Sequence, residues 1–154
     1  MKKDGLISTF LNIIFFSLVI IAATIFFVYD KKWIGFVFVI IGLLDLATLR
    51  IFGVKTNTLW PDIVFGAVDN GVLAIGAIIG ADFAGVLGAI IGSCAANTVT
   101  DGLAGLFEGE TAEFLRKKGV KEKKTALSSS LGKMAGCLFG AGLVFIVLWS
   151  IFSL

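Results

Sequence analysis

The sequence predicts an all-α, polytopic integral membrane protein in which residues 1–154 form a single transmembrane domain. Hydrophobic residues make up 58% of the 154-residue chain and charged residues only 16%, a balance outside the range of soluble domains. The apolar residues also gather in about five stretches, each close to the roughly 20 residues that a membrane-spanning helix needs. Almost no chain remains for a domain outside the membrane.

The five predicted transmembrane helices cover residues 6–29, 33–52, 61–81, 83–108 and 130–154. The first has no charge between Gly5 and Tyr29, so it exceeds the core of a signal peptide, about 7–15 residues, and no convincing cleavage site follows it. We therefore expect it to be retained, with its bulky side chains facing lipid. Residues 6–52 are then two peripheral helices, and residues 61–154 form a three-helix core that carries the polar residues.

Glycines spaced four residues apart distinguish the last three predicted helices from the first two. They are Gly76 and Gly80, Gly88 and Gly92, and Gly132, Gly136 and Gly140. In lipid, small residues at this spacing let helix backbones approach closely. The pattern predicts Gly-rich close packing of these helices. We also expect a homodimer, and the pattern leaves open which glycine face would form it.

Lysine and arginine are distributed unevenly between the predicted loops. The loop after the fourth predicted helix holds Arg116, Lys117, Lys118, Lys121, Lys123 and Lys124, and the N-terminus adds Lys2 and Lys3 on the same side. The other side has only Lys31 and Lys32. Because positive residues in short loops stay cytoplasmic, we predict a cytoplasmic N-terminus and a C-terminus outside. The basic loop could also bind anionic membrane lipids, although setting the topology is its simpler role.

Several kinds of chemistry are excluded by what the chain lacks. It has no histidine, which excludes imidazole metal ligands and imidazole general bases. Cys94 and Cys137 lie inside predicted helices at a spacing that fits neither a zinc site nor a disulfide framework. Because neither histidine nor a cysteine site is available, carboxylates must carry any proton or metal chemistry. We also expect no nucleic-acid partner, no small-molecule cofactor and no enzymatic activity.

Polar residues interrupt two of the predicted helices at similar depths. Asp69 and Asn70 lie in the helix over 61–81, with Asp69 13 residues before a turn expected near Asp82, and Asn97 lies 15 residues after that turn. At 1.5 Å per residue, Asp69 and Asn97 are each about 20 Å from the turn, so the two polar clusters are expected to meet.

The predicted helix over 83–108 carries a polar face. At 100° per residue, Asn97, Asp101 and Glu108 fall within about 40° of one another, with Ser93 at the edge of this face. An ionised carboxylate at such depth costs at least about 2.5–3.5 kcal/mol, so the face should line the bundle interior or a water-filled path.

The internal charges do not balance. Besides Arg50, the only nearby internal cation is Lys133, which could pair with Asp69 or Asp101 in a purely structural network. One lysine cannot neutralise these two carboxylates and Glu108 together. The surplus negative charge favours a bound cation.

The predicted ligands of that cation all present hard oxygen atoms. Asp69, Asp101 and Glu108 offer carboxylates, Asn70 and Asn97 offer amide carbonyls, and Thr100 and Ser93 offer hydroxyls. Such ligands suit Ca²⁺ and also Na⁺, whereas zinc and copper normally recruit His or Cys. The "DNG" sequence could unwind the helix and free backbone carbonyls for the ion, although a continuous helix is the simpler expectation.

Three short motifs resemble one known family. "FGAVDNG", "NTVTDGLAG" and "LGKMAG", in this order between Phe65 and Phe145, are similar to the transmembrane protein 65 family of the mitochondrial inner membrane, which is linked to sodium-dependent calcium efflux. The resemblance places Asp69 and Asn70 on the family's DN pair. Asn97, Thr100 and Asp101 fall on its N-x-x-(S/T)-D pattern and Lys133 on its G-K, while Glu113 matches a family glutamate if one residue is inserted near Gly102. Because the chain begins without a presequence, the resemblance implies a prokaryotic relative in a cell membrane.

These observations together predict a secondary cation transporter, with Ca²⁺ and Na⁺ as the exchanged ions. A channel would need a continuous pore, and therefore oligomerisation. A non-transporting membrane regulator or scaffold stays open. A metal-dependent lipid-phosphate enzyme is less favoured, because "DGLAG" is similar to only a fragment of the aspartate motif of CDP-alcohol phosphotransferases.

Asp45 lies outside the resembling region, deep within the predicted helix over 33–52. Its simpler role is a hydrogen-bonded contact between helices. The alternative is a proton-linked site separate from the cation ligands.

Overall fold

Helices account for all the regular structure in the computed structural model of the chain, which describes residues 3–54, 59–117 and 125–152. The elements in chain order are α1 (Lys3–Phe27), α2 (Lys31–Ile51), α3 (Trp60–Lys117), α4 (Ala126–Phe145) and the π-helical segment η2 (Ile146–Ile151), which directly continues α4. Within these ranges, four helices are long and apolar enough to cross a membrane. The predicted all-helical class, with membrane-length apolar helices, is confirmed.

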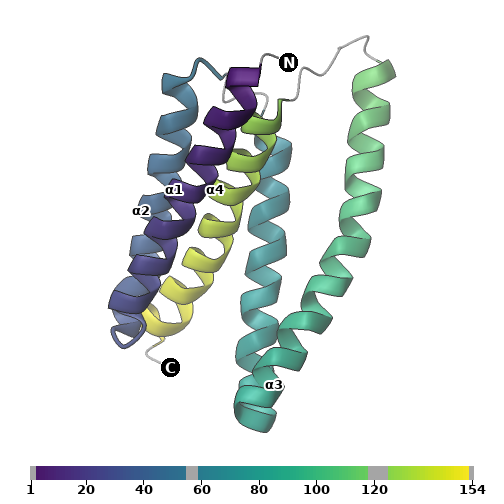
Figure 1. Cartoon of the computed structure of the whole chain (residues 1–154). Helices are drawn as coiled ribbons and strands as arrows, with labels where there is room; N and C mark the ends of the chain where they lie inside the picture. The colour runs from purple at the N-terminus through teal and green to yellow at the C-terminus, as the bar shows by residue number, and fades with distance from the viewer. Residues whose placement is uncertain (1–2, 55–58, 118–124, 153–154) are drawn as a thin grey trace.

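The helix α3 covers both the third and the fourth predicted helix. It is 58 residues long, and its backbone departs from helical geometry only at Ala84 (φ −145°, ψ 25°) and Gly85 (φ 58°, ψ −136°). Glycine adopts the positive φ of Gly85 without steric strain. Figure 1 shows that the chain reverses there, so α3 consists of a first arm, residues 60–83, and a second arm, residues 86–117. The reversal falls close to the turn expected near Asp82.

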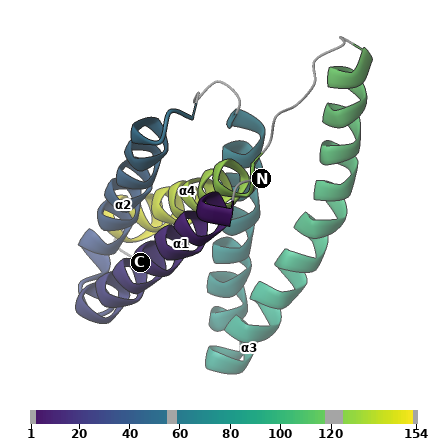
Figure 2. The ribbon, with the colours of Figure 1, turned by 45° about the horizontal axis from the view of Figure 1, so that its top comes forward.

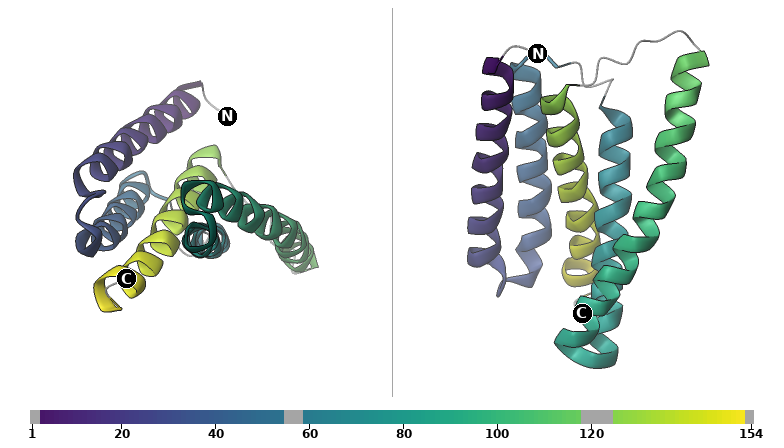
Figure 3. Two further views of the ribbon diagram at one scale, coloured as in Figure 1. Left: turned by 90° about the horizontal axis from the view of Figure 1, so that it is seen from below. Right: turned by 45° about the vertical axis from the view of Figure 1, so that its right-hand side comes forward.

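The helix α4 lies between α2 and the first arm of α3 (Figure 3). On the α2 side, Gly35 packs against the backbone of Gly142, and Gly42 packs against Phe139. The buried positions of α2 recur along one stripe that faces α4: Ile34, Gly35, Ile41, Gly42, Asp45 and Leu49. The second predicted helix therefore takes part in a buried contact along its length.

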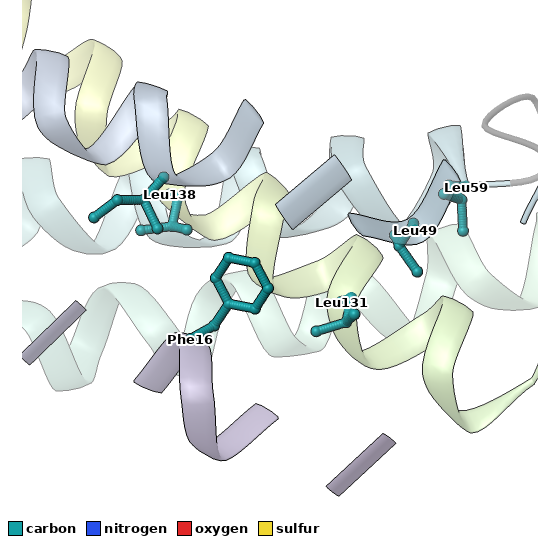
Figure 4. Packing of buried hydrophobic residues seen from close by; sticks show 6 residues of the cluster. Phe16, Leu49, Leu59, Leu131 and Leu138 are labelled. Carbon is teal, nitrogen blue, oxygen red and sulfur yellow. The ribbon is translucent and has the colours of Figure 1, made fainter. Parts of the chain in front are cut away.

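A small apolar core fills the space between α1, α2 and α4. It consists of Phe16, Ile41, Leu49, Leu59, Leu131 and Leu138. Figure 4 shows the Phe16 ring, from α1, directed toward the leucines of α2 and α4. Most other large side chains of α1 are exposed, including Phe10 at 63% and Phe26 at 81%, which suits contact with lipid.

Glycines bring three helical segments into backbone contact. A Cβ atom added to Gly136 or Gly140 of α4 would overlap the backbone of Ile63 or Ala67 in the first arm of α3. In the same way, Gly80 and Gly88 face each other across the reversal, as do Gly76 and Gly92. The two arms are close near the reversal and diverge toward the other end (Figure 2).

The start of α4 differs from the expected one. The predicted helix begins at residue 130, but the N-cap is Thr125, whose hydroxyl accepts from the Ser128 backbone N–H at 3.1 Å. The Ser128 hydroxyl in turn accepts from the Thr125 N–H at 2.9 Å. This capping box begins the helix at Ala126, because it satisfies two N–H groups that the first turn leaves without partners.

Candidate cation site

Asp69 and Thr100 connect the two arms of α3. The Thr100 hydroxyl donates to Oδ1 of Asp69, across 31 residues of sequence. It also lies 3.2 Å from the carbonyl oxygen of Ala96 and 3.0 Å from that of Asn97. Thr100 is only 3% exposed. The two polar clusters thus meet, as the depth argument predicts, through this pair.

The Asp69–Thr100 pair lies well inside the span. Asp69 follows Trp60 by nine residues and precedes Ala84 by 15. With a rise of 1.5 Å per residue, it is about 14 Å from the start of the first arm and about 22 Å from the reversal. The "DNG" residues 69–71 are helical, so the continuous-helix expectation is correct and no unwound carbonyls are available there.

Asn97 and Asp101 form a second pair on the second arm. The Asn97 amide donates to Oδ2 of Asp101 at 2.9 Å, as their shared face predicts. Asp101 is exposed, because it follows Gly92 by nine residues and therefore lies about 180° from the face that Gly92 presents to Gly76. Thr100 is only about 80° from Gly92, which is why it meets the first arm instead.

The helix α4 forms the third wall of the site. The Asn70 amide donates to the carbonyl oxygen of Cys137 at 3.4 Å. Lys133 places its ammonium 4.9 Å from the centroid of the Phe65 ring, a cation–π contact. Lys133 lies four residues before Cys137, one helical turn from the residue that Asn70 contacts.

Two other predicted site residues, Ser93 and Glu113, do not join the Asp69–Thr100 pair in the described structure. The Ser93 hydroxyl donates to the carbonyl of Ile90 at 2.9 Å, within its own helix. Glu113 is exposed and pairs with Lys117 at 2.9 Å, one turn further along the second arm. The side chain of Glu108 and most of the basic loop lie outside the described residues.

The described residues contain no group of three or more His, Cys, Asp or Glu side chains that could together hold a metal ion. Asp69 and Asp101 instead accept from different partners, Asp69 from Thr100 and Asp101 from Asn97. The predicted ligands divide into an inner set, Asp69, Thr100 and Asn70, and an outer pair, Asn97 and Asp101.

Asp62 makes a further polar contact between α3 and α4. It is 3% exposed, and the Ser129 hydroxyl donates to its Oδ1 at 3.5 Å. In the sequence, Asp62 lies seven residues before Asp69, two turns away on the same face, while its position beside Pro61 is typical of a helix start. Because α4 covers this face, Asp62 is buried against Gly132 rather than exposed at a helix end.

In comparisons with known proteins, no family model matches the chain, and no curated protein and no solved structure matches it either. The resemblance to the transmembrane protein 65 family therefore rests on the three short motifs alone.

Proposed function

We propose that the protein is a secondary cation transporter that exchanges Na⁺ for Ca²⁺, and that Asp69 and Thr100 lie at the centre of its ion site. The observation that carries this proposal is the bond between these two side chains, which places a carboxylate between two helical arms at a depth where an ionised group is costly. The motif resemblance supports the same function.

The ion would be held by oxygen atoms from both arms. Asp69 and Thr100 already adjoin, and the Asn70 carbonyl and the Asn97–Asp101 pair would supply further oxygen ligands from the predicted set. The two arms diverge on the side of their glycine contacts that faces away from the reversal, so the second arm has room to rotate about its axis. Such a rotation would turn Asp101 toward Asp69. Two carboxylates balance one Ca²⁺ or two Na⁺, so the same site could hold either ion in turn, as exchange requires.

The proposal includes a membrane arrangement. Each arm of α3 crosses the membrane, which makes five crossings, with the N-terminus and the basic loop cytoplasmic and the C-terminus outside a cell membrane. The glycine contacts hold the core helices together. A homodimer suits the exposed position of Asp101, because a second chain would shield its carboxylate from lipid. Membrane lipids are the other partners, and we propose no enzymatic activity.

A non-transporting regulator or scaffold is the second candidate. It is favoured by the bonds that the polar residues make with one another, because Asp69 accepts from Thr100 and Asp101 accepts from Asn97. Such bonds could serve only to join helices. The two candidates differ in whether ions move.

The test is calcium flux in sealed liposomes that contain the purified protein. In wild-type liposomes, a sodium gradient should drive Ca²⁺ against the Ca²⁺ concentration gradient. Dissipating the sodium gradient should stop this Ca²⁺ flux. Asp69→Asn should abolish the flux, whereas Asp82→Asn, at the exposed reversal of α3, should leave it unchanged. Folded wild-type protein that moves no Ca²⁺ under any gradient would favour the scaffold.

A further inference from the structure

Asp45, in the middle of α2, is completely buried. Its exposed fraction is 0%, and neither oxygen of its carboxyl group has a hydrogen-bond partner among the residues that the structure describes. The simpler expectation from the sequence, a hydrogen-bonded contact between helices, is therefore wrong for these residues. A buried polar group without a partner requires another explanation.

The surroundings of Asp45 are apolar. Ile41 and Leu49 lie one turn before and one turn after it on the same stripe, and both belong to the apolar core between α1, α2 and α4. Leu131 and Ala135, on the facing side of α4, are each 0% exposed. Figure 4 shows Leu131 close to the Phe16 ring of α1, and Leu49 further along the same cluster, toward Leu59. Asp45 thus belongs to the most tightly buried part of the molecule.

Among the described side chains, no charge packed against α2 faces Asp45. On α1, residues 7–27 contain no titratable group, and η2 contains none either. On α4 the only charged residue, Lys133, lies over Phe65 of α3. On α2 itself, Arg50 is exposed and about 140° round the helix, and Lys31 and Lys32 are at its far end. Asp62 of α3 lies against α4, and α2 makes no contact with α3.

Among the described side chains, an ionised carboxylate in this position would have neither a countercharge nor a hydrogen-bond donor, and this is the most costly way to bury a charge. A metal cation could compensate it only with several further oxygen ligands, about six to eight for Ca²⁺. The nearest hydroxyl on α2, that of Thr48, already donates to the carbonyl of Leu44 at 2.9 Å. A proton needs no coordination shell and makes the group neutral.

We propose that Asp45 is a proton-binding site, separate from the cation site on α3, and that it holds its proton while α2 is packed against α4. The proton comes from water and binds a carboxylate oxygen, and it can leave only when α2 separates from α4 and admits water. Proton release at Asp45 is thereby linked to the position of the α1–α2 hairpin.

The sign of the effect on stability follows from proton counting. The native chain holds this proton at neutral pH, where an exposed aspartate in the unfolded chain has lost it, so the native state binds one proton more. Stability must then fall as pH rises through the neutral range. Asp45→Asn, which is neutral at every pH, removes this dependence and leaves the protein more stable than wild type at alkaline pH.

Infrared difference spectroscopy of the purified full-length protein tests the proposal directly. Wild-type protein at neutral pH should show the carbonyl stretch of a protonated carboxylic acid, lost at alkaline pH. Asp45→Asn should lack this band, and the matched control Asp82→Asn should retain it. Melting curves across pH should show a falling transition temperature for wild type and the control, and a flat one for Asp45→Asn.

Four results would overturn the assignment without reference to transport. If the wild-type spectrum lacks the band, or if Asp45→Asn retains it, the proton is not bound at Asp45. Failure of Asp45→Asn to fold would count equally against it, because Asn closely matches the shape of the protonated acid. Loss of the band on adding Na⁺ at constant pH would assign the site to sodium instead.

Discussion

Thr100 and Asp69 are 31 residues apart in sequence, yet the Thr100 hydroxyl donates to the Asp69 carboxylate between the two arms of α3. The bond lies far from the reversal at Ala84 and Gly85, on the side where the arms diverge. The bond therefore joins the two arms at a level where glycine contacts no longer hold them together. Any change in what Asp69 binds should alter how the arms are held.

Replacing Thr100 by valine tests the importance of this bond. The variant keeps the shape of the side chain but removes the donor, so Asp69 loses a hydrogen bond to a charged group, worth about 1.5–3 kcal/mol. We expect a loss of that size in chemical or thermal unfolding. The matched control is Thr98→Val, because the Thr98 hydroxyl is exposed and bonds only to the carbonyl of Cys94. Its effect should stay within about 0.5 kcal/mol, and equal losses in both variants would contradict the account.

Calcium should raise the melting temperature of the detergent-purified protein, because a ligand that binds only the native state stabilises it. Asp101→Asn should remove most of this shift if Asp101 turns inward to complete the ion site. The measurement is a melting curve with calcium and with chelator for each protein. Asp82→Asn serves as the control, and a shift of wild-type size in folded Asp101→Asn would remove Asp101 from the ligands.

The glycine contacts predict a large difference between two similar substitutions. A Cβ atom in Gly80→Ala would overlap the carbonyl of Gly88, whereas one in Gly102→Ala would meet nothing within 4 Å. We expect Gly80→Ala to destabilise by about 1–3 kcal/mol through overpacking. Gly102→Ala should be neutral, or more stable by about 0.5–1 kcal/mol, because alanine favours the helix. Similar stability in both variants would mean that the arms are not held at this contact.

The sequence predicts the positions of the helices well, because long apolar stretches mark them without reference to packing. It does not predict which faces are buried, since lipid is as apolar as a protein core and hydrophobicity no longer distinguishes the two. This is why α2 is expected at the periphery, although its stripe from Ile34 to Leu49 packs against α4. The reversal is expected near Asp82 but requires only two non-helical residues, Ala84 and Gly85, which no apolar pattern indicates.

The polar site was predictable in part. The helical periodicity correctly pairs Asn97 with Asp101, and the depth argument correctly brings the two polar clusters together. The polar face of the second arm is expected to line the bundle interior, but Asp101 is exposed, and Gly88 and Gly92 mark the face that approaches the first arm. Measured from Gly92, Thr100 is nearer to that face than Asp101, so Thr100 rather than Asp101 reaches Asp69.

The stability of Asp69→Asn in chelator and in calcium tests the central claim, that Asp69 belongs to a cation site, most directly. If Asp69 is part of a site with surplus negative charge, the mutation relieves repulsion while Asn keeps an oxygen that can accept from Thr100. The variant in chelator should then be at least as stable as wild type, and calcium should no longer stabilise it. If Asp69 instead serves to neutralise Lys133, the variant in chelator should lose about 3–5 kcal/mol, as broken buried ion pairs do. Such a loss, with the calcium response preserved, would contradict the ion site.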